Sequence, residues 1–255
     1  MRDRARPRAR RRRRVVSHDR PLLRLRAHQR GVPLVSVVLK VGGASIGGTA
    51  DIVRELRTLG HSVCVVHGAG PQISQEMERR GLEVRFVEGR RVTTLEALEV
   101  VRESFAEINA AVCATIGPDA LPLAGDEIGL EAEQVPELGL VGQPVPSRPL
   151  EVVAALEQGR VPVVTPLARG PLNVNADEMA TALAVGLGAQ RILFLTDVPG
   201  VFHEGRLLHS IPAAEAEALV GRGSFDGGIV PKLLAASRAA RSGLRAEIGA
   251  TAVVA

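Results

Sequence analysis

Short apolar runs alternate with amphipathic stretches along most of the chain. The apolar runs predict buried strands, which are VSVVL (35–39), HSVCVV (61–66), VPVVT (161–165), RILFLT (191–196) and terminal strands near 244–254. Helical periodicity predicts one helix through Ile52, Leu56 and Leu59, and further helices at 71–80, 95–115, 149–158, 176–187, 212–220 and 228–242. Such alternation predicts an α/β fold whose mainly parallel sheet is covered by helices on both faces.

Two segments interrupt this alternation. LEVRFVEGRRVT (82–93) reads as a β-hairpin, and residues 118–147 carry Gly and Pro with short apolar stretches, which is typical of hairpins and loops. We find no internal repeat in the sequence.

Glycine-containing turns follow the first two predicted strands. Lys40-Val41-Gly42-Gly43 follows the first strand, and His67-Gly68-Ala69-Gly70 follows the second. In mainly parallel sheets ligands bind beyond the carboxyl ends of the strands, and glycine turns that lead into helix N-termini let backbone N–H groups approach an anion. The two turns therefore predict a phosphate site, although neither matches a Walker loop or the GxGxxG fingerprint. We expect His67 to be a turn residue and not a metal ligand.

The chain contains thirty arginines but only two lysines, Lys40 and Lys232. An ammonium is a compact charge that can follow one oxygen, whereas a guanidinium is a wide planar fork, so the two lysines are candidates for a role that Arg cannot fill. Lys232 also stands in the first turn of a predicted helix, where it opposes the helix dipole unless an anion lies there. The alternative is that codon bias left two lysines by chance.

The segment Asn173-Val174-Asn175-Ala176-Asp177 precedes a predicted helix. Asn175 is a candidate N-cap and Asp177 a first-turn acid that complements the dipole. In a functional interpretation, Asp177 holds ammonium groups in place while the Asn amides bind a polar substrate. Both interpretations stay open from the residues alone.

Six motifs in order carry a family resemblance. They are VVLKVGG, VVHGAGPQI, the GRRVT turn, NVNADEMATALAVGLGA, LFLTDVPGV and GGIVPKLLAA. From about residue 35 to the end, the chain resembles the amino acid kinase superfamily, and within it the family that phosphorylates N-acetyl-L-glutamate in arginine biosynthesis. The resemblance implies a three-layer α/β/α sandwich with an amino-acid and dimerisation lobe (34–170) and a nucleotide lobe (171–255).

The resemblance also implies a role for each matching residue. Lys40 and Lys232 would contact the transferred phosphoryl group, and Asp177 would align both lysines. Arg91 would clamp the substrate carboxylate. The substrate side would further include Gly68, Ala69, Gly70, Asn173 and Asn175, and the nucleotide side Gly42, Gly43, Thr196, Asp197, Gly227, Gly228 and Ile229. Ala69 departs from the glycine that is usual in the family, and a negative φ would make this change harmless.

The implied reaction is direct in-line phosphoryl transfer from ATP to a carboxylate. Such transfer relies on positioning and electrostatic stabilisation, and a carboxylate nucleophile needs no general base. Mg²⁺ would accompany the ATP phosphates, and no protein metal site is expected. The alternatives are a kinase for α-aminoadipate or glutamate attached to a carrier protein, and a non-catalytic nucleotide-binding regulator.

Charge and cysteine content set the remaining expectations. Residues 1–33 carry a net charge of +11 and the rest −7, so the basic balance belongs to an Arg-rich extension that we expect to be disordered. The extension reflects a misplaced start site, a basic arm for polyanions such as nucleic acid, or a transit peptide.

Cys64 and Cys113 fit free thiols in a reducing compartment, and no apolar run is long enough to span a membrane. We expect a cytoplasmic, arginine-insensitive homodimer.

Overall fold

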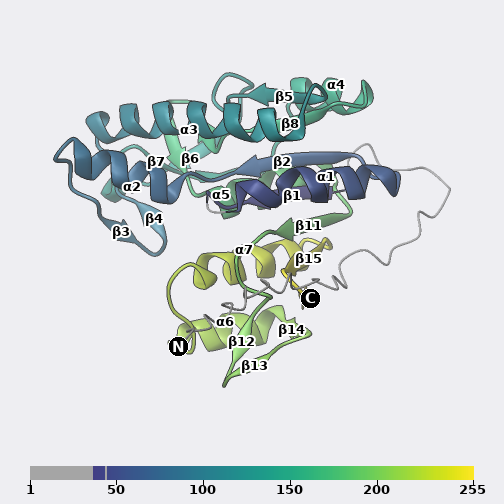
Figure 1. The fold of residues 1–255 in the computed structure, drawn as a ribbon. Coiled ribbons are helices and arrows are strands. Elements are labelled where there is room, and N and C mark those ends of the chain that lie inside the picture. The colour runs from purple at the N-terminus through teal and green to yellow at the C-terminus, as the bar shows by residue number, and fades with distance from the viewer. Residues whose placement is uncertain (1–36, 44) are drawn as a thin grey trace, which may run out of the picture.

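The computed structural model describes residues 37–43 and 45–255 (Figure 1). The Arg-rich extension predicted for residues 1–33 lies outside the described residues. Within them, α-helices and a long central sheet form the body of the molecule, and two small hairpins project from it. None of the helices in the described part combines the length and apolarity needed to cross a membrane.

The central sheet has eight strands in the order β14-β16-β15-β11-β1-β2-β8-β5. Their bounds are β1 Val37–Val41, β2 Val63–His67, β5 Ala120–Leu123, β8 Val161–Val164, β11 Arg191–Phe194, β14 Ser210–Pro212, β15 Arg245–Ile248 and β16 Thr251–Val254. Only the β15–β16 pair within this sheet is antiparallel. The mainly parallel sheet predicted from the sequence is confirmed.

Helices cover both faces of this sheet, as the sequence predicts for a three-layer sandwich. The helices are α1 Thr49–Thr58, α2 Gly70–Arg79, α3 Leu95–Ile116, α4 Leu150–Glu157, α5 Ala176–Leu187, α6 Ala213–Gly221 and α7 Ile229–Arg241, with short 3-10 helices at Ile46–Gly48 and Pro136–Leu138. Helices α1 and α3 pack on one face and α4, α5 and α7 on the other, while α2 packs on α3 and α6 on α7.

The alternation of side chains along β1 decides which face receives Lys40. Leu39 and Val41 point into the core beneath α1 and α3, and Val38 points into the core beneath α5 and α7. Because successive side chains of a strand point to opposite faces, Lys40 shares the face of Val38. The alternation of side chains along β1 therefore directs the Lys40 ammonium toward α5.

Several short strands lie outside the central sheet. β6 Ala132–Gln134, β7 Val141–Pro144, β9 Leu167–Ala168 and β10 Leu172–Val174 form a four-stranded sheet, and β12 Phe202–His203 with β13 Arg206–Leu207, and β3 Phe86–Val87 with β4 Arg90–Arg91, form two hairpins. The β3–β4 hairpin confirms the one predicted at 82–93. The predicted boundary between lobes at residue 170 falls in the turn between β9 and β10.

Two local predictions are wrong. Residues 118–147 are not all hairpins and loops, because β5 joins the edge of the central sheet in parallel with β8. The first two strands also extend further than predicted, so Lys40 and Val41 belong to β1 and His67 ends β2. Pairing of the two strands with each other, in which Val41 lies opposite His67, rather than local residue preference, sets these ends.

Candidate active site

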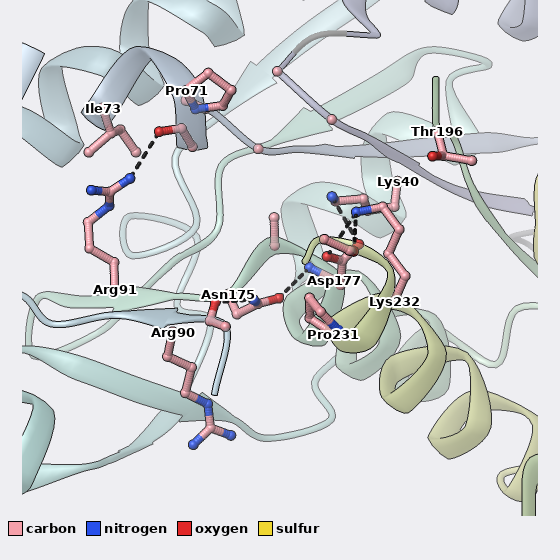
Figure 2. Close-up of a pocket in the computed structure, with 18 of the residues that line it drawn as sticks. Lys40, Pro71, Ile73, Arg90, Arg91, Asn175, Asp177, Thr196, Pro231 and Lys232 are labelled. Carbon is pink, nitrogen blue, oxygen red and sulfur yellow. Dashed lines mark hydrogen bonds and ion pairs between the residues drawn. The ribbon is translucent and has the colours of Figure 1, made fainter. Parts of the chain in front are cut away.

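A pocket of about 560 Å³ opens at the carboxyl ends of β1 and β2. Its walls come from both glycine-containing turns, the β3–β4 hairpin, the start of α5, the loop after β11 and the start of α7 (Figure 2). The predicted site residues that line it are Lys40, Gly42, Gly43, Gly68, Ala69, Gly70, Arg91, Asn173, Asn175, Asp177, Thr196, Asp197, Gly228, Ile229 and Lys232. Gly227 is not a lining residue, and its φ of +58° shapes the turn before α7.

Asp177 brings the two lysines together. Its Oδ1 lies 2.9 Å from Lys40 Nζ, and its Oδ2 lies 3.6 Å from Lys232 Nζ. Figure 2 shows both ammonium groups converging on the one carboxylate from different elements. The lysines are 192 positions apart in the sequence, so only the folded sheet and α5 place them on a shared partner.

The start of α5 is built to hold Asp177 in this position. Asn175 is the N-cap residue, and its side-chain oxygen accepts hydrogen bonds from the backbone N–H groups of Asp177 (2.8 Å) and Glu178 (3.2 Å). The Asn175 amide nitrogen donates to Gly89 O of the hairpin at 3.0 Å. The capping interpretation of Asn175 is therefore correct, and the same side chain also lines the pocket.

The charge balance around Asp177 favours an anionic ligand. Two ammonium groups share one carboxylate, which leaves one excess positive charge in a largely buried cluster. Burial lowers the pKa of Lys232; Asp177 and, more weakly, Asp197 oppose this shift, and Lys40 adds to it. A phosphate group in the pocket would neutralise the excess charge and stabilise the ammonium form of Lys232.

Two helix N-termini face the pocket without a side-chain cap. Helix α2 starts after Ala69 and α7 after Gly228, and neither residue's side chain accepts a bond from the first turn. The free N–H groups and the helix dipoles favour an anion at the N-termini of both α2 and α7.

Ala69 has a φ of −140°, so its Cβ causes no backbone strain, and the departure from glycine is harmless there.

Arg91 lies across the pocket from the lysines (Figure 2). The residue is 5% exposed, its guanidinium donates to Gly70 O at 2.9 Å and to Ser74 Oγ at 2.8 Å, and its Cζ lies 4.5 Å from the centroid of the Phe86 ring. Burial lowers the pKa of Arg91 to about 10. Among the described residues no carboxylate pairs with Arg91, so a buried cation faces the pocket with neutral partners only. A carboxylate of a substrate would supply the missing charge.

The remaining predicted residues lie at the two ends of the pocket. Asn173 donates to Thr93 Oγ1 at 3.0 Å, which places its amide beside Arg91 on the hairpin side. Thr196 and Asp197 follow β11, and the Thr196 hydroxyl donates to Asp197 Oδ1 at 3.2 Å. These polar groups divide the lining into an Arg91 end and a lysine end.

His67 is not the turn residue that the sequence predicted. It is fully buried at the end of β2, where its Nε2 accepts from Asn109 Nδ2 at 3.2 Å, and the Phe105 ring lies 6.0 Å away. Burial lowers its pKa to about 4, so the imidazole is neutral at physiological pH. Asn109 also donates to Val163 O at 2.9 Å, and the trio therefore joins β2, α3 and β8.

Sequence reasoning missed three pocket residues of the hairpin, which are Phe86, Gly89 and Arg90. The sequence did contain a signal for them, which is their position in the predicted hairpin, where Arg90 directly precedes the predicted carboxylate-binding residue Arg91. Strand alternation sends the two arginines to opposite sides, which Figure 2 shows plainly. The sequence could not show what each arginine would contact.

Comparison with known proteins supports the kinase resemblance. The Amino acid kinase family matches residues 36–249. The chain belongs to the amino acid kinase family. The acetylglutamate kinase of Rubrobacter xylanophilus is 40% identical over 222 residues, which cover 84% of this chain and 88% of that protein. The acetylglutamate kinase of Methanopyrus kandleri is 38% identical over 233 residues, covering 83% and 93%.

Solved structures share the fold. The protein smu.665 of Streptococcus mutans UA159 superposes with a TM-score of 0.78 at 24% identity, covering 86% of this chain and 98% of that one. Giardia carbamate kinase gives a TM-score of 0.65 at 16% identity, with the same coverage. The amino acid kinase fold predicted from the motifs is confirmed.

Proposed function

We propose that this amino acid kinase transfers the γ-phosphoryl group of ATP to the γ-carboxylate of N-acetyl-L-glutamate, a step of arginine biosynthesis. The observation that carries the proposal is the pocket itself, with a buried Arg91 that no carboxylate of residues 37–43 and 45–255 pairs with at one end, and two lysines on Asp177 at the other. The named relatives, at 38% and 40% identity over most of their length, agree with this activity.

The residues divide the work between binding and transfer. Arg91 binds the α-carboxylate, Asn173 lies beside the acylated amine, and the γ-carboxylate is then directed toward the lysines. A carboxylate oxygen attacks the γ-phosphorus while the bond to the β,γ-bridging oxygen breaks, which yields an acyl phosphate and ADP. Lys40 and Lys232 stabilise the charge on the transferring oxygens, and Asp177 holds both lysines in place.

Mg²⁺ enters this proposal with the nucleotide. Among the described residues no group of three or more His, Cys, Asp or Glu side chains is arranged to hold a metal ion, and Asp177 is already paired with two lysines. Mg²⁺ commonly keeps several waters and binds through substrate phosphates, so these residues suit MgATP as the substrate rather than a metal caged by the protein. Homodimeric assembly and a cytoplasmic location remain predictions.

A hydroxylamine trap tests the activity. The purified protein with MgATP should give a hydroxamate from N-acetyl-L-glutamate and far less from L-glutamate or α-aminoadipate. An Asp177→Asn variant, which removes the shared counter-charge of the lysines, should lose the signal and so exclude a contaminating kinase. Strong activity on free glutamate with none on the acetylated substrate would contradict the proposal. No observation favours the carrier-linked substrates, and membership of a kinase family disfavours the regulator.

A further inference from the structure

The β3–β4 hairpin depends on polar contacts for its position. Its apolar residues are poorly covered, since Phe86 is 51% exposed and Val87 38%. At its tip, Gly89 O accepts the hydrogen bond from Asn175 of α5, and a Cβ added to Gly89 would lie 3.3 Å from Pro231 Cβ of α7. The tip therefore fits against the residue that precedes Lys232. A segment with so little buried apolar surface opens easily unless specific contacts hold it.

Arg90 makes the strongest of these contacts. Its guanidinium binds both oxygens of Glu178 in α5, at 3.1 Å and 2.9 Å, and also donates to Gln143 of β7 at 2.6 Å. Arg238 of α7 donates to the same Glu178 at 3.0 Å. The Arg90 and Glu178 side chains are 16% and 11% exposed, so water screens this pair less than it screens a surface pair, whereas Arg238 is half-exposed. One carboxylate thus joins the hairpin, α5 and α7.

The position of Glu178 links this network to the site. It directly follows Asp177 in the first turn of α5, so one helix end presents Asp177 to the lysines and Glu178 to the hairpin. The hairpin carries Arg91, and α7 carries Lys232. A ligand that fixes the hairpin through Arg91 therefore also restrains the start of α7, and a ligand that fixes α7 restrains the hairpin.

We propose that Arg90 is a positioning residue that couples binding of the amino acid at Arg91 to binding of MgATP at Lys232 through the Arg90–Glu178–Arg238 network. This inference rests on the proposed function, because it assigns the two ligands to the two ends of the pocket. Coupling between sites is reciprocal, so each ligand should raise the affinity for the other by the same factor. The network joins the β3–β4 hairpin to α7 through Glu178, so the amino acid and MgATP both favour the same position of the hairpin.

Calorimetry with MgAMP-PNP and N-acetyl-L-glutamate tests the coupling. The wild-type protein should bind N-acetyl-L-glutamate at least about fivefold more tightly when MgAMP-PNP is present, the lower end of typical coupling. The ratio of the two affinities for N-acetyl-L-glutamate, with and without MgAMP-PNP, should fall below about twofold in Arg90→Leu. Arg238→Leu should give an intermediate ratio. Arg90→Lys, which can keep one bond to Glu178, should recover part of the ratio. In steady-state assays, Arg90→Leu should raise KM for the amino acid more than it lowers kcat.

Arg241→Leu is the matched control. Arg241 lies in α7 one turn from Arg238 but pairs with Glu217 of α6, so its loss should leave the ratio at the wild-type value. Hydrogen exchange of the hairpin amides should accelerate in Arg90→Leu and not in Arg241→Leu. If Arg90→Leu does not fold, Glu178→Gln removes the opposite charge of the same ion pair and must lower the ratio.

The outcomes separate the two proposals. A wild-type ratio near one with both ligands bound, or a wild-type ratio retained in Arg90→Leu, overturns the coupling role and leaves the proposed function intact. Failure of the wild-type protein to bind either ligand rejects the proposed function, and the coupling role with it.

Discussion

Asp177 has two ammonium partners and Arg91 has no carboxylate partner among the described residues, and these facts give the pocket its chemistry. The Arg91 end carries a positive charge that no described carboxylate pairs with, and at the lysine end two ammonium groups share Asp177, with Asp197 acting on Lys232 as well. Each substrate is an anion, so the charges that are costly to bury in the free protein become partners when the ligands bind. The retained lysines fit this arrangement, since a point charge can follow an oxygen during transfer.

Replacing either lysine by arginine should harm catalysis although the charge is kept. We expect Lys40→Arg and Lys232→Arg each to lower kcat about 10²-fold or more, roughly 3 kcal/mol, while binding of MgATP falls much less. Steady-state kinetics and calorimetry measure the two effects. Arg54→Lys, at an exposed pair on α1, is the control and should have no effect. Near-normal turnover of both lysine variants would favour codon bias as the reason for the two lysines.

Arg91→Lys tests the carboxylate clamp. A planar fork binds a carboxylate through two parallel bonds and a lysine ammonium cannot, so KM for N-acetyl-L-glutamate should rise about tenfold or more while KM for MgATP changes little. The side-chain bonds to Gly70 O and Ser74 Oγ would weaken as well, so a melting curve should accompany the kinetics. Equal increases in both KM values would show that the clamp is misplaced.

At the scale of elements, α5 is the centre of the site. Its N-cap residue Asn175 touches the hairpin, its first turn carries Asp177 and Glu178, and its body packs on β1, β2, β11 and α7. Gly186 near its end approaches other backbone closely, because an added Cβ would lie 2.1 Å from Ser147 O and 2.4 Å from Ser147 N. Glycine therefore lets the end of the helix approach the segment before α4.

Gly186→Ala should destabilise the protein despite the better helix propensity of alanine. We expect a loss of about 2 kcal/mol or more, since the neighbour is backbone and cannot rotate away. Gly221→Ala in α6 is the control. In the part of the chain that the structure describes, no atom beyond its chain neighbours and its own helix backbone lies within 4 Å of an added Cβ, so stability should be unchanged or slightly raised. Urea unfolding measures both variants. Similar stability of the two would mean that the Ser147 segment yields at little cost.

At the scale of the whole molecule, buried polar groups tie the layers together. His67 and Asn109 join β2, α3 and β8 inside the core, away from solvent. The folded-state pKa of His67 is about 4, below its ordinary value of 6.5. Its stabilising contribution is therefore fully present above pH 6.5 and is lost as pH falls toward 4, because the unfolded chain then binds a proton that the folded protein excludes.

The free energy of unfolding should show this loss. Between pH 7 and pH 5 the wild-type protein should lose roughly 2 kcal/mol more than His67→Gln, which keeps an acceptor for Asn109 but cannot titrate. Urea unfolding at the two pH values measures the difference. Identical pH dependence of both proteins would show that His67 is not the group that titrates.

The sequence by itself determined the class of fold and pointed to residues that line the pocket. Strand and helix periods depend on local side-chain order, so α5 at 176–187 and α3 from Leu95 were predicted almost to the residue. Glycine turns and the two rare lysines were likewise visible as local motifs. Tertiary structure alone decided where strands end, since pairing with neighbours extended β1 through Lys40 and recruited β5 into the central sheet. It also decided the partners that no motif indicated, because the contacts of Glu178 with Arg90 and Arg238 join residues that are distant in sequence and meet only when the sheet and helices pack.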